Sequence, residues 1–182
     1  MRILWFTNTT SLYPLKATSN LVGGWIEALE RKFYCAEDIE LAIAFDYSVK
    51  GAPSITVNNV TYFPVYSNLG NKFIRVLRNI LKLKFSNDDI SAYIQVVKRF
   101  NPDIITVFGT EGRFGLIASS TSVPVIIHIQ GIVNSCLFNW YPPGISRKNF
   151  NACFDMEWFL HNTGPRNDED KFIKSAEREL KI

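Results

Sequence analysis

The sequence has no long apolar run and no recognisable export signal. No stretch among its 182 residues approaches the roughly 18 apolar residues of a membrane-spanning helix, which excludes integral membrane proteins. The apolar run that begins at Arg2 is too short for the core of a signal peptide, and no small-residue cleavage site follows it. We therefore expect a cytoplasmic protein. Hydrophobic residues make up 47% of the chain and charged residues 20%, which is typical of a single globular domain.

Histidine and cysteine are too scarce for a metal centre or a disulfide framework. There are only two histidines, His128 and His161, so a histidine-rich metal site is excluded. The three cysteines are odd in number, lie far apart and form no C-x-x-C pair. We expect Cys35, Cys136 and Cys153 to be free thiols in the core, and we expect no metal ion and no bound cofactor.

The common phosphate-binding and hydrolase motifs are also missing. No G-x-x-x-x-G-K-[ST] sequence occurs, which excludes a P-loop NTPase, and no G-x-S-x-G elbow of a hydrolase is present. The first apolar strand is not followed by G-x-G-x-x-G, which argues against an NAD dehydrogenase. Gly109, Gly112 and Gly115 look similar to that motif, but their spacing differs and they follow a middle strand.

Acidic residues are absent from Tyr47 to Asn87, a stretch that carries six basic ones. Over Lys72–Phe85 the apolar residues cover one side of a predicted helix, across roughly 200°. Two interpretations stay open: a core-facing helix with a solvated basic back, or an interfacial helix lying on anionic lipid. Nucleic acid is not expected as a partner, because no aromatic residues are interleaved with the charges. The basic residues that would contact the membrane are Lys72, Arg75, Arg78, Lys82 and Lys84.

Apolar strands alternate with helical segments, which predicts a parallel α/β sheet. The expected strands are Arg2–Thr7, Glu40–Phe45, Ile55–Val57, Val60–Phe63, Ile104–Phe108 and Val123–Ile129. The expected helices are a segment from Gly23-Gly24-Trp25 to about Phe33, then Leu69–Phe85, Asp88–Phe100, Leu116–Ser120 and Asp168–Leu180. Asn58-Asn59 predicts a tight turn between the two short strands, and Pro64 is expected to end the second of them.

This pattern predicts an α/β fold with a Rossmann-like, open, mostly parallel sheet and helices on both faces. We expect a single domain over residues 1–182, with residues 132–182 as a less regular peripheral segment. An α/β pattern would continue into another strand after the last helix. We therefore expect the chain to be one half of a longer two-domain enzyme.

Polar residues and glycines follow three of the strands directly. Ligands of open parallel sheets bind at the carboxyl ends of the strands, and glycines there let a ligand approach the backbone. The candidate site residues after these strands are Asn8, Thr9, Gly23, Gly24, Glu111, His128, Gln130 and Gly131.

Each candidate also has a plain structural interpretation. Gly23 and Gly24 could serve simply to form the turn before a helix. Glu111 could be a solvated loop carboxylate. His128 lies inside an apolar strand and is more typical of a hydrogen-bonded core histidine. Gln130 ends the strand and is the better candidate to face a ligand.

Several of these segments together resemble the N-terminal domain of GT-B-fold glycosyltransferases. The resemblance rests on four segments: the strand that begins at Arg2, Gly23-Gly24-Trp25 with Leu29, Asn101–Ile105, and Val123–Ile127 with Gln130-Gly131. It covers most of Met1–Gly131, and the nearest match is the retaining group 1 family, glycosyltransferase family 4.

The resemblance implies retaining transfer of a sugar from a nucleotide-sugar to a glycan or lipid-linked acceptor in bacterial cell-surface polysaccharide synthesis. This half would bind the acceptor, and a second domain with a Glu-x7-Glu motif would bind the donor. The family's glycine pair, beside donor phosphates and acceptor, falls on Gly23 and Gly24. The family's histidine that contacts the donor sugar is replaced by Gln130, with His128 two residues earlier. Gln130 and Glu111 are the catalytic candidates, and this chain alone should be inactive.

Two other classes of function stay open at this point. One is a non-catalytic subunit that binds a partner chain or the inner face of the cell membrane. The other is a flavodoxin-like domain that binds a small phosphorylated ligand. Flavin colour or tight nucleotide binding by the chain alone would favour the flavodoxin-like domain.

Overall fold

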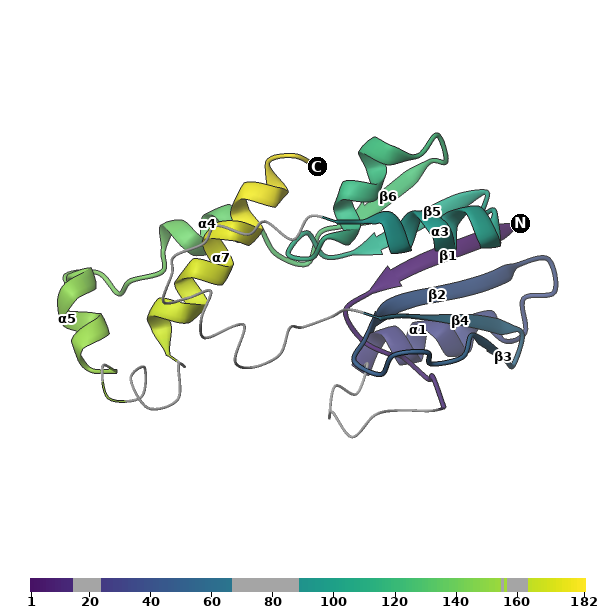
Figure 1. Ribbon diagram of the computed structural model, residues 1–182, viewed down its shortest axis with the longest axis horizontal. Helices are drawn as coiled ribbons and strands as arrows, with labels where there is room; N and C mark the ends of the chain where they lie inside the picture. The colour runs from purple at the N-terminus through teal and green to yellow at the C-terminus, as the bar shows by residue number, and fades with distance from the viewer. Residues whose placement is uncertain (15–23, 67–88, 155, 157–163) are drawn as a thin grey trace.

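The computed structural model describes residues 1–14, 24–66, 89–154, 156 and 164–182. Its centre is a six-stranded sheet in the order β3-β4-β2-β1-β5-β6 (Figure 1). The strands are β1 (Arg2–Thr7), β2 (Glu40–Tyr47), β3 (Ile55–Val57), β4 (Val60–Tyr66), β5 (Ile104–Phe108) and β6 (Val125–His128). All neighbouring strands run parallel except β3, which pairs antiparallel with β4. The expected α/β fold with a mostly parallel sheet is therefore confirmed.

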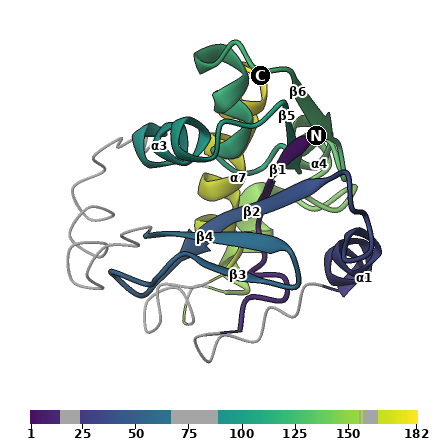
Figure 2. The ribbon, with the colours of Figure 1, turned by 90° about the vertical axis from the view of Figure 1, so that its right-hand side faces the viewer.

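Helices cover both faces of the sheet, as Figure 2 shows for α1 and α3. On one face α1 (Gly24–Phe33) packs on apolar side chains of the central strands, among them Ile3 and Trp5 of β1. On the other face α3 (Ser91–Phe100) and the short 3₁₀ helix η1 (Phe114–Ser120) cover a second cluster. Both faces of β1 are thus buried, which explains its unbroken apolar sequence.

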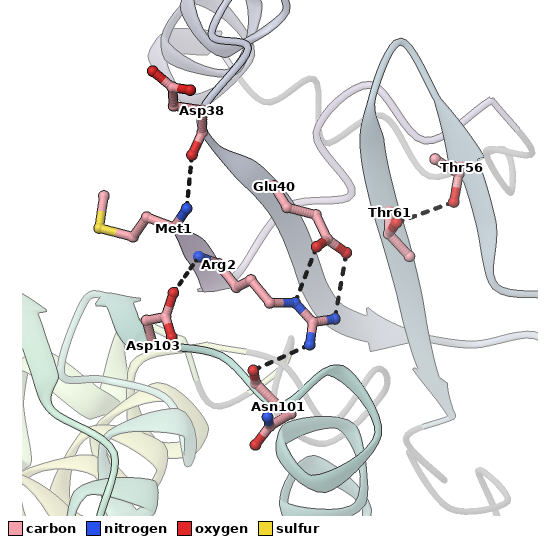
Figure 3. Close-up of polar contacts among 8 residues, drawn as sticks. All are labelled: Met1, Arg2, Asp38, Glu40, Thr56, Thr61, Asn101 and Asp103. Atoms are coloured by element: carbon pink, nitrogen blue, oxygen red, sulfur yellow. Dashed lines mark hydrogen bonds and ion pairs between the residues drawn. The ribbon is translucent and has the colours of Figure 1, made fainter.

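Polar contacts hold the amino-terminal edge of the sheet (Figure 3). The Arg2 backbone N–H donates to Asp103 Oδ2 at 2.6 Å, which joins β1 to the residue before β5. The Arg2 guanidinium pairs with Glu40 at 3.0 Å, and the Met1 amino group donates to the Asp38 carbonyl at 2.7 Å. The Arg2–Glu40 pair is solvent-exposed and contributes little stability by itself, but together these contacts set the register of the two central strands.

The hairpin forms as expected, but its second strand is longer. Asn58 and Asn59 both have positive φ, 49° and 65°, which matches a two-residue turn of the mirror-image type. Pro64 does not end β4, which continues to Tyr66. The reason is that β3 pairs with β4 only as far as Tyr62, so at Pro64 no β3 residue requires the missing N–H group.

Three further expectations about burial and boundaries were wrong. The strand expected to be buried over Val123–Ile129 is β6, an edge strand of only four residues on which Ile126 is 53% exposed. Helix α3 begins at Ser91 rather than Asp88, and its N-cap residue is Ile90. The Asp89 carboxylate, just before the cap, accepts a hydrogen bond from the Ser91 N–H at 2.9 Å and so holds a turn ahead of the helix. The three cysteines are free but exposed: Cys35 lies in the turn after α1, and Cys136 and Cys153 lie in or at the end of the short helices α4 and α5.

After β6 the chain leaves the sheet on the side where β1 ends (Figure 1). It forms α4 (Val133–Phe138), α5 (Arg147–Ala152) and α7 (Pro165–Glu179), and α4 packs against α7. The expected basic helix at 72–85 lies outside the described residues. In the described ranges, none of the helices combines the length and apolar character needed to cross a bilayer.

Candidate functional site

The strand order reverses between β1 and β5, the position at which open α/β sheets have their ligand crevice. From β1 the chain passes through α1 on one face to β2, and β4 follows on the same side of β1. Strand β5 lies on the other side of β1, and the segment after it, η1, packs on the opposite face. The loops that follow β1 and β5 thus diverge to opposite faces of the sheet. In open α/β sheets this reversal of strand order is where ligands bind.

Asn8 and Glu111 meet at this crevice. The Asn8 Nδ2 group donates a hydrogen bond to Glu111 Oε1, and both residues are exposed. Gly109, with φ of 92°, makes the turn that folds Glu111 back over the end of β5, and a β-carbon there would collide with the Glu111 carboxylate. The pair offers amide and carboxylate groups side by side, which suits a hydroxyl-bearing ligand.

Arg113, Tyr93 and Asp46 form a second polar group beside η1. Arg113 Nη2 donates to the Tyr93 hydroxyl at 2.6 Å, and this hydroxyl donates to Asp46 Oδ1 at 2.5 Å. Burial and the hydrogen bond to Asp46 raise the pKa of Tyr93, so the phenol keeps its proton. The direct Arg113–Asp46 ion pair is longer, at 3.4 Å, and Tyr93 therefore acts as the bridge between the two charges.

Glu179, at the end of α7, joins the loop after β5 to the start of α4. Its carboxylate accepts hydrogen bonds from Thr110 Oγ1 at 2.6 Å and from the Val133 and Asn134 backbone N–H groups at 3.0 Å each. The Asn134 side chain adds a fourth, at 2.7 Å. Burial alone would raise the pKa of Glu179, but these four hydrogen bonds outweigh it and lower its pKa to about 2.

His128 lies at the surface, not in the core. Its ring centroid is 5.4 Å from that of Trp25 and 5.8 Å from that of Phe108. The prediction of a core histidine was wrong because β6 is the edge strand, and helix α1 covers His128 only through the half-exposed indole of Trp25.

The other predicted residues follow the same strand ends. Thr9 has a buried hydroxyl without a hydrogen-bond partner in the described part of the chain, and Gly24 opens α1 with φ of 47°. The Gly131 carbonyl accepts a hydrogen bond from Thr110 Oγ1 at 3.4 Å, and Gln130 is exposed beside it. Whether Asn8, Gly24, Glu111 and Gln130 border one depression stays a prediction. Gly23 and the five basic residues Lys72, Arg75, Arg78, Lys82 and Lys84 lie outside the described residues.

Sequence reasoning missed Asp46, Arg113 and Glu179. Asp46 directly follows the apolar run of β2, so the rule that singled out Asn8 and Glu111 would have found it as well. Arg113 lies in the glycine-bearing loop and could have been noted there. Glu179 stands in a charged terminal helix far along the chain, and the local sequence carries no signal for its contact with Thr110.

The comparisons with known proteins give a likeness of fold. No family model matches the chain, and no curated protein matches its sequence. Among solved structures, a sucrose-phosphate synthase from Thermosynechococcus elongatus is similar, with a TM-score of 0.50 and 6% sequence identity. The similarity covers 85% of this chain and 39% of the synthase chain, so this chain spans less than half the length of that enzyme.

Proposed function

We propose that this chain is the acceptor-binding half of a retaining glycosyltransferase that uses a nucleotide-sugar donor. The observation that carries the proposal is the Asn8–Glu111 pair, which stands where the strand order reverses and is therefore in the expected ligand position. The fold likeness to part of a sucrose-phosphate synthase and the GT-B-like sequence segments support the same assignment. The acceptor is a glycan or a lipid-linked sugar of cell-surface polysaccharide synthesis.

Positioning of the acceptor and the donor sugar accounts for most of the catalysis in this reaction. The Glu111 carboxylate accepts a hydrogen bond from the attacking acceptor hydroxyl, and the Gln130 amide holds the donor sugar where the family has a histidine. The substrates contact the remaining candidate residues, which are Asn8, Thr9, Gly23, Gly24, His128 and Gly131. Orientation of the hydroxyl and stabilisation of the departing diphosphate lower the barrier without a covalent nucleophile on the enzyme.

The donor nucleotide binds a second domain, which the resemblance places after this half. Alone, the chain should then transfer no sugar and bind nucleotide-sugars weakly. Calorimetric titration with UDP- and GDP-sugars tests this expectation. Micromolar binding of either donor to this chain alone would contradict the assignment of donor binding to another domain.

The acceptor site itself can be tested by NMR titration of the ¹⁵N-labelled chain. A glycan acceptor should shift the Asn8 side-chain amide signal, because that amide donates to Glu111 in the crevice. Glu111→Gln should weaken this response by about tenfold, because a hydrogen bond to a charged acceptor is stronger than one to a neutral amide by about 1–1.5 kcal/mol. The exposed Glu37→Gln, which is remote from the strand ends, serves as the matched control. Equal responses in both variants would remove Glu111 from the site.

In this proposal the basic helix expected from the sequence at 72–85 binds the half-enzyme to the inner face of the membrane. Each basic residue near an anionic surface adds about 1 kcal/mol, and the effect fades with salt. The test is co-sedimentation with anionic phosphatidylserine-containing vesicles of the wild type and of an Arg75/Arg78/Lys82→Glu variant. Equal binding of both, or no binding by either at low salt, would exclude this helix as the membrane contact.

A further inference from the structure

Away from the strand ends, the peripheral helices border an open cavity. It measures about 300 Å³, at the lower end of the range of ligand pockets. It lies between the start of α7 and the segment that contains α5. Its lining is made of Trp140, Phe150, Phe154, Gly164, Pro165 and Asp168. None of the residues assigned to the acceptor site lines it.

The aromatic walls of this cavity are supported from behind. The Trp140 ring packs on Phe172, with 4.8 Å between ring centroids, and Phe150 packs edge-on against Tyr141 at 5.6 Å. The Tyr141 hydroxyl in turn donates to the buried Glu169 carboxylate at 2.5 Å. Because these rings have fixed partners, the walls are held in place before any ligand enters.

The charges around the cavity balance one another. Asp168, the carboxylate of the lining, is paired with Lys171 at 2.6 Å, and Glu169 is paired with Arg147 at 2.9 Å. An ammonium ligand would meet the Lys171 ammonium beside the Asp168 carboxylate, and an anion would meet that carboxylate itself. The pocket therefore favours a neutral ligand, one with apolar faces for the rings and hydroxyl groups for Asp168 and Lys171.

We propose that this cavity is a second carbohydrate-binding site, separate from the acceptor crevice at the strand ends. The electron-rich faces of Trp140, Phe150 and Phe154 attract the polarised C–H groups on the flat side of a pyranose ring. Asp168 accepts a hydrogen bond from a sugar hydroxyl, while the neighbouring Lys171 can donate one to a sugar oxygen. A site of this kind holds a sugar unit of a longer glycan without taking part in chemistry. It does not depend on the proposed transfer reaction.

NMR titration of the ¹⁵N-labelled full chain tests this site. The probes are maltotetraose, cellotetraose and mannotetraose, with choline chloride and uridine as the alternative ligands. At least one tetrasaccharide should shift the Trp140 indole N–H signal in a saturable way. No shift by any of them at about 10 mM, or a shift produced only by choline or uridine, would overturn the proposal.

Two variants check that an aromatic wall binds the ligand and that the Asp168 charge is not required. Phe150→Leu keeps an apolar side chain but removes an aromatic face, and should weaken binding by about tenfold. Phe138→Leu is the matched control, because Phe138 is 90% exposed on α4 and lies outside the lining. Asp168→Asn keeps an oxygen acceptor and loses only a charge that Lys171 already balances, so a neutral sugar should still bind within about threefold. Loss of sugar binding in Phe138→Leu but not in Phe150→Leu would contradict this site.

The same titration separates this site from the acceptor crevice. A tetrasaccharide that shifts the Asn8 amide but not the Trp140 indole would overturn the second site and leave the proposed function standing. A shift of the Trp140 indole alone would support the second site without bearing on the transferase assignment.

Discussion

At the scale of single residues, the buried carboxylate of Glu30 organises the chain next to the candidate site. Its Oε2 accepts hydrogen bonds from the Ser11 hydroxyl and, at 3.3 Å, from the Leu12 N–H group, both in the segment that follows β1. Its Oε1 accepts from the hydroxyls of Tyr34 and Tyr62. Burial, and then Glu30 itself, raise the pKa of Tyr62, so that phenol remains a donor. Glu30 thereby ties α1, β4 and the segment after Asn8 together.

Replacing Glu30 with leucine should lower the free energy of unfolding by about 3 kcal/mol. Leucine fills a similar volume but leaves the buried hydroxyls of Ser11 and Tyr62 without their acceptor, and each unsatisfied buried donor costs about 1–3 kcal/mol. Urea denaturation followed by circular dichroism measures the change. Glu37→Leu, at an exposed position after α1, is the control and should change stability by less than about 0.5 kcal/mol. A similar small effect for Glu30→Leu would show that the donors find other partners.

The β3–β4 turn allows a stabilising substitution. Asn59 has φ of 65°, a conformation that glycine adopts without steric cost and that Asn-Gly turns favour. Asn59→Gly should raise the free energy of unfolding by about 0.5 kcal/mol, and Asn59→Val should lower it by about 1–2 kcal/mol. Thermal unfolding of both variants beside the wild type checks this order. A valine variant as stable as the glycine variant would be inconsistent with positive φ at this position.

Residue environments were the least predictable feature of the sequence. The apolar neighbours of His128 and the usual burial of cysteine both favoured a core position. Both predictions failed for the same reason: exposure depends on which strand is at the edge and which helix is peripheral, and local sequence does not encode that. The predicted turn at Asn58 and Asn59 was confirmed, because a two-residue turn is specified by the local sequence.

At the scale of elements, strands were predicted well wherever burial on both faces produced a continuous apolar run. Strands β1 and β5 have the predicted bounds, and β2 extends only two residues further. β6 was predicted too long, because its flanking apolar residues Val123 and Ile129 gave the same local signal. The contacts of α7 could not be predicted, since they join residues almost 70 positions apart, as in the Thr110–Glu179 bond.

The last turn of α7 braces the candidate site. Arg178 Nη2 donates to the Glu111 carbonyl at 2.8 Å, and Glu179 receives the hydrogen bonds from Thr110 and the start of α4. The Ile182 side chain packs so closely on Gly115 that a β-carbon there would overlap it. Glu111 and Gly131 therefore depend on α7 for their relative placement, although they belong to different loops.

This brace should respond to acid in a defined direction. The pKa of Glu179 is lowered from 4.5 to about 2, so its contribution to stability is fully present above pH 4.5 and is lost as the pH falls through 2. Wild-type urea midpoints should fall more steeply between pH 4.5 and 2 than those of Glu179→Gln, which has no carboxylate to protonate. Glu177→Gln, at an exposed position of the same helix, should keep the wild-type slope. Identical slopes for Glu179→Gln and the wild type would exclude this linkage.

At the scale of the whole molecule, the place of the candidate site was predictable and its full membership was not. The rule that ligands bind at the carboxyl ends of strands identified Asn8 and Glu111 as two separate candidates. In the structure the two side chains are in contact. Their pairing depends on β5 lying next to β1, which requires the strand order and cannot be obtained from either segment alone. The bridge between Asp46 and Arg113 depends in the same way on Tyr93, in the first turn of α3, lying between the end of β2 and the loop after β5.

The chain shortened to residues 1–131 should still fold cooperatively. Both apolar clusters of the sheet are built from residues between Ile3 and Ile127, and all six strands end by His128. In the described part of the chain, residues 132–182 contact the loop after β5 through Glu179, Arg178 and Ile182. Removal of residues 132–182 should therefore lower the urea midpoint. Unfolding should still show a single transition, and the circular dichroism spectrum should remain rich in strand. Amide exchange should accelerate most in the loop Gly109–Gly115, which loses its brace. An unfolded product would instead make residues 132–182 an integral part of one domain, because the sheet and its two helical layers would then be insufficient by themselves.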